Sequence, residues 1–211
     1  MPASPAPALP PLPYTPAHPL RTERLDLRPV TLDDTTAIHA YRSLPEVCRY
    51  LYSNPIDETT AHEAVTAQAA RTTLRTSGDV LQLAVAVRET GHLIGDVTFV
   101  LTSTTHRQGG IGYVFHPAHS GHGYATEAAR ALLKIGFEDL RLHRIQAELD
   151  GRNTASARPL ERLGMRREGH LRENEFLDGE WTDEVIYALL ADEWRALRAP
   201  EDRRPPAPSA P

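Results

Sequence analysis

A short segment with two glycines carries the clearest chemical signal in the sequence. It reads Ser120-Gly121-His122-Gly123-Tyr124-Ala125-Thr126 and follows an apolar run that Pro117 ends. Apolar residues at helical spacing come next, so the order is strand, glycine turn and helix start. Glycine permits backbone torsions and close approaches that other residues forbid. Free N–H groups at such a helix start can converge on an anion, for example a phosphate or a pyrophosphate.

Two better-known nucleotide-binding loops do not fit this segment. A dinucleotide-binding fingerprint needs a third glycine where Thr126 stands. The sequence also contains no Gly-x-x-x-x-Gly-Lys-Ser/Thr loop. Taken alone, the segment could equally be an ordinary strand-to-helix turn whose glycines serve packing. Its interpretation therefore depends on the rest of the chain.

The elements around the loop predict a mixed α/β sheet. Apolar and polar residues alternate in seven segments that we expect to be strands, at 24–30, 80–87, 93–101, 111–116, 144–149, 167–176 and 182–190. Apolar spacing and capping residues predict helices at 31–43, 57–76, 126–140 and 153–163, with a last helical turn or two at 192–198. Hairpin turns are expected at 89–92 and at Asp178-Gly179. Hairpins come first and β-α-β units later, which argues against a doubly wound parallel sheet.

Composition limits the classes of protein that this chain can belong to. Prolines gather in residues 1–20 and 199–211, so we expect two disordered tails around one folded domain at 21–198. The formal net charge of -5 argues against a general nucleic-acid surface. No apolar run is long enough to span a membrane, and the first residues do not read as a signal peptide. We therefore expect a cytoplasmic protein, and Cys48, the one cysteine, excludes an intrachain disulfide. The oligomeric state stays open, with a homodimer as one option.

The glycine loop is one of several landmarks that occur in order between Gly112 and Gly169. The others are Gly-Tyr before the loop, Tyr-Ala-Thr-Glu-Ala directly after its second glycine, Asn-x-x-Ser at 153–156 and Leu-Gly-Met at 163–165. With these landmarks, the stretch from about residue 21 to residue 194 resembles the GNAT superfamily of N-acetyltransferases. The most similar branch is the RimJ/RimL type, which acetylates protein N-terminal amines. The resemblance implies a seven-stranded GNAT-type sheet, flanked by helices, in which two central parallel strands splay apart.

The resemblance also implies where acetyl-CoA, the cosubstrate, would lie. Its pantetheine arm would pair with strand 111–116 near Val114 and His116, opposite strand 143–149, and its pyrophosphate would lie on the loop. A backbone N–H near Val114 would polarise the thioester carbonyl, and an uncharged amine would attack directly, without a covalent enzyme intermediate. The residues expected to bind the cofactor are Val114, Phe115, His116, Ser120, Gly121, His122, Gly123, Tyr124, Ala125, Thr126, Asn153 and Ser156.

Two departures from the family pattern affect the expected chemistry. Ser120 stands where the loop usually begins with Arg, Gln or Trp, which removes one side-chain contact to the phosphates. The Tyr that protonates the departing CoA thiolate in many members would fall at Leu160. Ser156 lies nearer the expected place of the sulfur, so it is the candidate acid or a relay to water. The plainer alternative is a polar residue in the first turn of a helix.

A base must remove a proton from the acceptor ammonium before attack. The family often has a Glu just before the central strand, and Gln108-Gly109-Gly110 stands there instead. Six acids and no Lys or Arg lie between residues 173 and 184, which would attract a cationic amine. Glu173 and Glu175 are the favoured bases among them, with a solvated hairpin face as the alternative. His116 is a further candidate because imidazole titrates near neutral pH.

We therefore expect an acetyl-CoA-dependent N-acetyltransferase whose leading acceptor is a protein N-terminal amine. A small-molecule amine, such as an antibiotic or a polyamine, is an alternative acceptor. A non-catalytic acyl-CoA-binding sensor is an alternative of another class, because the usual Tyr and Glu are missing. His116, His119 and His122 lack the further ligands of a zinc site, so no metal is expected.

Overall fold

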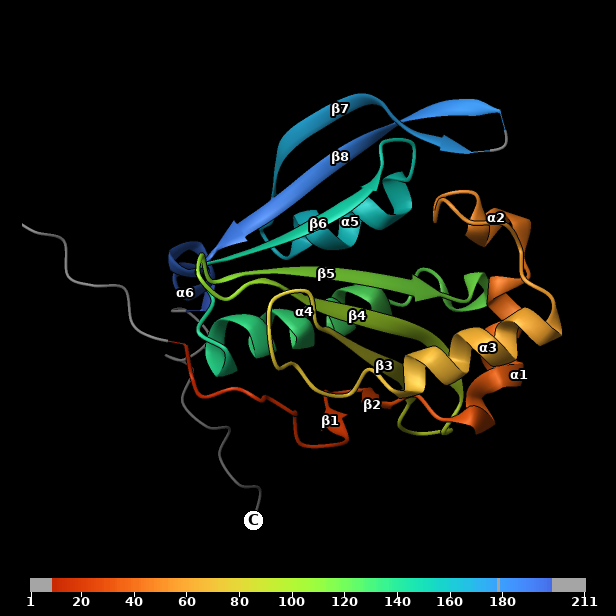
Figure 1. Cartoon of the computed structure of the whole chain (residues 1–211), viewed down its shortest axis with the longest axis horizontal. Helices are drawn as coiled ribbons and strands as arrows, with labels where there is room; N and C mark the ends of the chain where they lie inside the picture. Colours follow the sequence, from red (N-terminus) through yellow and green to blue (C-terminus); the bar gives the residue numbers. More distant parts are fainter. Residues whose placement is uncertain (1–8, 178, 199–211) are drawn as a thin grey trace, which may run out of the picture.

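A computed structural model describes residues 9–177 and 179–198 of the chain. An eight-stranded mixed sheet runs through it in the order β1-β2-β3-β4-β5-β6-β8-β7 (Figure 1). The strands are β1 (Leu20–Arg21), β2 (Leu25–Pro29), β3 (Val80–Val87), β4 (Leu93–Ser103), β5 (Gln108–Phe115), β6 (Arg144–Asp150), β7 (Arg166–Leu177) and β8 (Glu180–Leu190). The helices are η1 (Leu32–Asp34), α1 (Thr35–Arg42), α2 (Pro45–Cys48), α3 (Glu58–Ala69), η2 (Pro117–His119), α4 (Tyr124–Lys134), η3 (Ile135–Asp139), α5 (Thr154–Arg162) and α6 (Ala191–Arg198).

Helices cover both faces of the sheet. On one face, α1 and α3 pack Ile38 and Val65 into a small apolar cluster that Val114 of β5 joins. On the other face, α4 and α5 pack against the main core, which Tyr113 and Phe115 of β5 join. Successive residues of a strand point to opposite faces. The face of Val114 is therefore the α1 face, and the face of Tyr113 and Phe115 is the α4 face.

A buried carboxylate fixes α1 to the sheet. Asp96 of β4 is 1 % exposed and accepts hydrogen bonds from the Tyr41 hydroxyl at 2.6 Å and the Gln82 amide at 2.6 Å. Arg42 of α1 adds an ion pair with Asp96 at 3.0 Å. A buried charge is tolerated only when it is paired and hydrogen-bonded. This network therefore sets α1 firmly over β4 and β5.

The two parallel strands β5 and β6 pair only at their starts. Their register joins Gln108 to Arg144, Gly109 to Ile145 and Gly110 to Gln146. Beyond these pairs, β5 and β6 continue without pairing to each other. Figure 1 shows them close together near α6 and diverging toward α2. The splayed central strands that the family resemblance predicted are thus confirmed.

Two predictions about the fold need correction. The second helix ends at Ala69 and not near residue 76, because Leu74 is fully buried and its backbone pairs in both directions with Tyr14. Residues 9–20 were expected to be disordered, and they instead lie against the domain. The Tyr14 hydroxyl donates to Asp139 at 2.6 Å.

The same N-terminal segment accounts for the eighth strand, because β1 pairs with β2. The short helix α2 was also not predicted. The predicted tails at 1–8 and 199–211, and Asp178 of the predicted hairpin turn, lie outside the described residues. Within the described part of the chain, every helix is too short or too polar to span a bilayer.

Candidate active site

The glycine loop connects η2 to α4. Gly121 and Gly123 have φ values of +83° and +80°, in the left-handed region that favours glycine. A Cβ atom at Gly121 would meet nothing within 4 Å, and one at Gly123 would meet only the Arg24 guanidinium at 3.6 Å. Backbone torsion, and not crowding, therefore requires the glycines. Gly123 is the N-cap residue of α4, so the first N–H groups of that helix lie at the loop.

A pocket of about 290 Å³ lies between the loop and α5. Its walls include seven of the residues predicted to bind the cofactor, namely Phe115, Ser120, Gly121, Gly123, Tyr124, Ala125 and Thr126. The Thr126 hydroxyl is buried and has no hydrogen-bond partner among the described residues. Leaving such a group unpaired costs about 1–3 kcal/mol. The free N–H groups at the start of α4 are what suit this pocket to an anionic group.

One face of α5 forms the opposite wall of this pocket. It carries Ala155, Arg158, Pro159 and Arg162, spaced as residues on one side of a helix. Neither arginine forms an ion pair with another residue in the described ranges. Both positive charges are thus available to an anion. Neither arginine was predicted as a binding residue, although two arginines four residues apart in a helix near a glycine loop are a usable signal.

The backbone of β5 turns alternate N–H groups toward the opening between β5 and β6. His116 N–H donates to the Ile94 carbonyl of β4 at 2.9 Å. In an antiparallel ladder, every second residue turns its backbone to the same neighbour. The Val114 N–H therefore faces β4, and those of Tyr113 and Phe115 face the opening. Of the two strand positions predicted to meet the cofactor, Val114 thus turns its N–H away from the opening, and the His116 N–H is already occupied.

Asn153 and Ser156 meet at the start of α5. The Asn153 side chain accepts the Ser156 N–H at 3.0 Å, so it caps the helix. The Ser156 carbonyl accepts a hydrogen bond from the Tyr113 hydroxyl at 2.5 Å, which ties α5 to β5. Burial raises the pKa of Tyr113 to about 12. Neither of these two contacts uses the Ser156 hydroxyl. Leu160, at the position of the family's Tyr, is buried in the main core.

The histidines around the loop are arranged in a way that does not suit His116 as a base. Its Nδ1 accepts the Ala118 N–H at 3.1 Å, so a neutral ring carries its proton on Nε2. Its ring lies edge-on to His119, with centroids 5.9 Å apart. Burial, with the charges of His116, His92 and His122, lowers the pKa of His119. Among the described residues, no three histidine, cysteine or acidic side chains are grouped as metal ligands.

Three glutamates come together on the α1 face of the sheet, beside the opening. They are Glu148 of β6, Glu175 of β7 and Glu184 of β8, and we call them the carboxylate cluster. The Asn174 amide donates to Glu184 at 2.8 Å and to Glu175 at 3.3 Å. Burial raises the pKa of Glu184, and the charges of Glu148 and Glu175 raise it further. Such a shift brings a carboxylate toward the pH range of a working base.

Of the two favoured glutamates, only Glu175 belongs to this cluster. Glu173 is exposed, has a φ of +51° and donates its backbone N–H to Asp183 at 2.9 Å. It lies in an irregular part of the β7–β8 ladder between Leu171 and Glu175. Glu148 escaped notice because its place opposite the hairpin depends on the register of β6 with β8.

A larger pocket of about 860 Å³ lies between α2, with the chain that follows it, and the β7–β8 hairpin. Figure 1 shows the free end of that hairpin extending toward α2. The hydroxyls of Tyr52 and Thr182 on its walls are both buried and lie near each other. Tyr52 also has a φ of +52°, which is strained for a bulky residue.

Tyr52 connects this larger pocket to the carboxylate cluster. Burial raises the pKa of Tyr52 to about 12, and the charges of Asp150, Glu184 and Glu175 contribute to the rise. The tyrosine therefore lies close to those carboxylates. Tyr52 is thus a residue of the pocket wall on which two members of the cluster, Glu175 and Glu184, act by their charge.

Comparisons with known proteins agree with this geometry. Residues 24–166 match the acetyltransferase (GNAT) domain. The uncharacterized N-acetyltransferase YnaD of Bacillus subtilis is 34% identical over 176 residues, which cover 83% of this chain and 98% of that protein. The crystal structure of a GNAT-family acetyltransferase from Bacillus anthracis superposes with a TM-score of 0.73 at 34% identity, over 82% of this chain and 98% of that one.

A relative with a named acceptor matches a shorter stretch. The ribosomal protein uS5-alanine N-acetyltransferase of Escherichia coli is 32% identical over 84 residues, which cover 40% of this chain and 43% of that enzyme. The family match spans more than half of the chain, and the splayed strands, the glycine loop and its pocket are all in place. The chain therefore belongs to the GNAT family, and it is an acetyl-CoA-dependent N-acetyltransferase.

Proposed function

We propose that this enzyme transfers the acetyl group of acetyl-CoA to the N-terminal amine of a polypeptide. The observation that carries the proposal is the pocket of about 860 Å³, whose wall residue Tyr52 is acted on by the charges of Glu175 and Glu184. That volume lies in the upper part of the range for sites that take drug-sized ligands. It suits the first residues of a peptide better than a single small amine. The named activity of the uS5-alanine N-acetyltransferase supports the same acceptor class.

The charges on the pocket walls are mixed. Arg49 and Arg152 line the pocket together with Glu46 and Glu180. Arg152 is paired with Asp150 at 2.8 Å and with Glu180 at 3.1 Å, so its one positive charge is shared between two carboxylates. A polypeptide carries its positive charge at the terminus, where the carboxylate cluster would attract it.

The chain's own groups can be assigned to the steps of direct acetyl transfer. Acetyl-CoA supplies the activated thioester. The Tyr113 N–H would hold the carbonyl oxygen as negative charge develops on it, and the Phe115 backbone would pair with the pantetheine arm. Glu184 would take the proton of the ammonium, directly or through water, with Glu175 and Glu148 keeping its pKa raised. The Ser156 hydroxyl would donate toward the departing thiolate.

A panel of acceptors tests the proposed function. Short peptides with free N-termini should be acetylated with kcat/KM at least about tenfold above spermidine or an aminoglycoside, because only they fill the pocket. The same peptides with blocked N-termini, even when they contain lysine, should not react. Release of free thiol and mass spectrometry of the products give both results. Faster turnover of a polyamine or an aminoglycoside would refute the polypeptide acceptor, and binding without thiol release for every amine would refute catalysis.

The proposed acid is tested by Ser156→Ala. We expect kcat to fall about tenfold with the KM for acetyl-CoA unchanged, because Asn153 caps the helix through the Ser156 backbone and not through its hydroxyl. Ser156→Thr keeps a hydroxyl and should retain most of the activity. Thr154→Ala, in the same helical turn, is the matched control. Wild-type turnover by Ser156→Ala would remove Ser156 from the mechanism.

A further inference from the structure

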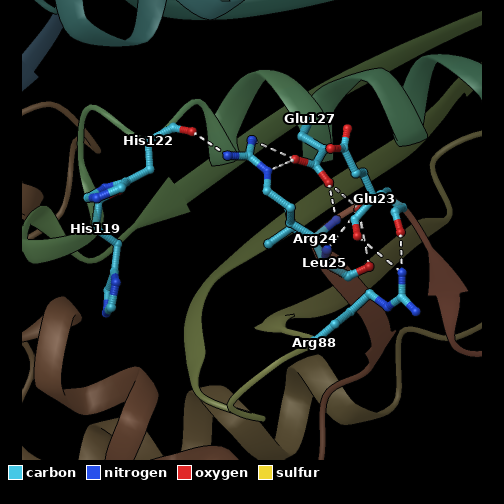
Figure 2. Close-up of polar contacts among 8 residues, drawn as sticks. Glu23, Arg24, Leu25, Arg88, His119, His122 and Glu127 are labelled. Atoms are coloured by element: carbon cyan, nitrogen blue, oxygen red, sulfur yellow. Dashed lines mark hydrogen bonds and ion pairs between the residues drawn. The ribbon is translucent and has the colours of Figure 1, made fainter.

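Arg24, just before β2, reaches across to the glycine loop. Its Nη1 donates to the His122 carbonyl at 2.9 Å, and its Nε donates to the Glu127 carboxylate at 2.8 Å. Its guanidinium also lies over the Tyr124 ring, 4.9 Å from the centroid. Figure 2 shows the side chain lying between the loop carbonyl and the first turn of α4. One arginine thus contacts the loop at His122 and Tyr124 and the first turn of α4 at Glu127.

Glu127 holds the Arg24 side chain in place. Besides the Arg24 side chain, its carboxylate accepts the Arg24 backbone N–H at 2.8 Å and the Thr22 hydroxyl at 2.6 Å. Burial alone would raise the pKa of Glu127, but the hydrogen bonds from Thr22 and Arg24 outweigh it and lower the pKa. The carboxylate therefore stays ionised at neutral pH. It neutralises Arg24, so Arg24 does not act mainly as a free positive charge.

The contact with His122 decides where the next N–H points. In a trans peptide, the carbonyl and the N–H point in opposite directions. The His122 carbonyl faces Arg24, so the Gly123 N–H faces away from Arg24. Gly123 lines the pocket next to the loop, whereas Arg24 does not. The loop's own contacts hold the His122 ring, which lies 3.3 Å from the His119 carbonyl and stacks on Tyr124, whereas the side chain that holds the His122 carbonyl is Arg24.

We propose that Arg24 is a positioning residue for the anion site, holding the His122–Gly123 peptide so that the Gly123 N–H points into the pocket. This inference rests on the proposed location of the acetyl-CoA pyrophosphate at the loop. Arg24 acts through the backbone and touches no reacting atom. Replacing Arg24 should therefore weaken the binding of the pyrophosphate of acetyl-CoA and leave the rate of the acetyl transfer step unchanged.

Arg88 offers a matched control for Arg24. It donates to the carbonyls of Thr22 and Glu23 at 2.9 and 3.1 Å, so it supports the same turn without touching the loop (Figure 2). The side chains of Arg24 and Arg88 are similarly exposed, at 44% and 42%. Arg24→Met and Arg88→Met therefore remove equivalent side chains from one turn, and only the first releases the loop.

Calorimetric titration with acetyl-CoA is the first test. Arg24→Met should weaken binding about tenfold or more, and Arg88→Met should bind as the wild type does. Turnover of S-acetylpantetheine, which has the same thioester and no phosphate, is the second readout. Arg24→Met should match the wild type with it, and with acetyl-CoA it should raise KM and leave kcat unchanged. Wild-type affinity for acetyl-CoA in Arg24→Met would overturn the inference, as would an equal loss with both thioesters.

Two further variants keep the outcome decisive. Arg24→Lys retains the charge but cannot reach the His122 carbonyl and Glu127 together, so it should restore only part of the affinity. Full recovery with lysine would mean that charge alone matters, which contradicts positioning. If a bulky residue at Gly123 abolishes binding and Arg24→Met does not, only the role of Arg24 fails. If neither change affects binding, the pyrophosphate location itself is wrong.

Discussion

Replacing Gly123 with leucine will weaken acetyl-CoA binding by about a hundredfold and leave the domain folded. The φ of +80° at Gly123 strains a leucine by about 1–2 kcal/mol, so the loop will relax to another torsion. That relaxation turns the first N–H groups of α4 away from the pocket. The core is spared, because a Cβ atom there meets only the Arg24 guanidinium at 3.6 Å. Calorimetric titration with acetyl-CoA measures the loss.

Gly78 supplies the control for backbone strain. It has a φ of +92°, and a Cβ atom there would meet nothing within 4 Å. Gly78→Leu should therefore lose as much stability in urea unfolding as Gly123→Leu, without any change in acetyl-CoA affinity. Equal affinities in both variants and the wild type would sink the assignment of the loop to the pyrophosphate.

Replacing Glu184 with glutamine will lower kcat/KM for the acceptor about a hundredfold at neutral pH, because the proposed base is lost. The pH profile carries the sharper expectation. A base works when it is ionised, so wild-type activity should rise as the pH passes upward through the raised pKa of Glu184. Glu148→Gln removes one of the charges that raise this pKa. The rising limb should then move to lower pH, toward the range of an ordinary glutamate.

Glu173→Gln separates the carboxylate cluster from the rest of the acidic hairpin. Its side chain is exposed and outside the cluster, so kcat/KM and the pH profile should match the wild type. If Glu173→Gln lowered kcat/KM a hundredfold and Glu184→Gln did not change it, the base would be Glu173 of β7 and not Glu184 of β8. Steady-state kinetics over a range of pH values decides between the two.

Features that depend on residues close together in the sequence were predicted correctly. The strand, glycine turn and helix around Gly121 and Gly123 follow from residue types a few positions apart, and the structure has them. The predicted boundaries of β3 at 80–87 are also those observed. The splayed strands came from the family resemblance, because the periodicity of a single strand does not reveal where it parts from its neighbour.

What escaped prediction depends on contacts between distant segments. Arg24 and Glu127 are 103 residues apart, and nothing near either one indicates the other. The end of α3 is set by the pairing of Leu74 with Tyr14, from a segment expected to be disordered. The N–H groups that face the opening depend on which side of β5 binds β4. If the register is wrong by one residue, the N–H assigned to the opening is that of Val114 and not those of Tyr113 and Phe115.

The parting of β5 and β6 gives the cosubstrate a second role. A sheet that opens in its middle has two internal edges, and backbone groups on such edges need partners. A pantetheine arm lying along β5 would close the gap as a missing strand does. The free enzyme is then an incomplete fold, and both acetyl-CoA and the product CoA would complete it. A ligand that binds only the native state adds about 2.7 kcal/mol of stability at a hundred times its Kd. The resistance of this protein to unfolding would thus rise with the concentration of acetyl-CoA or CoA.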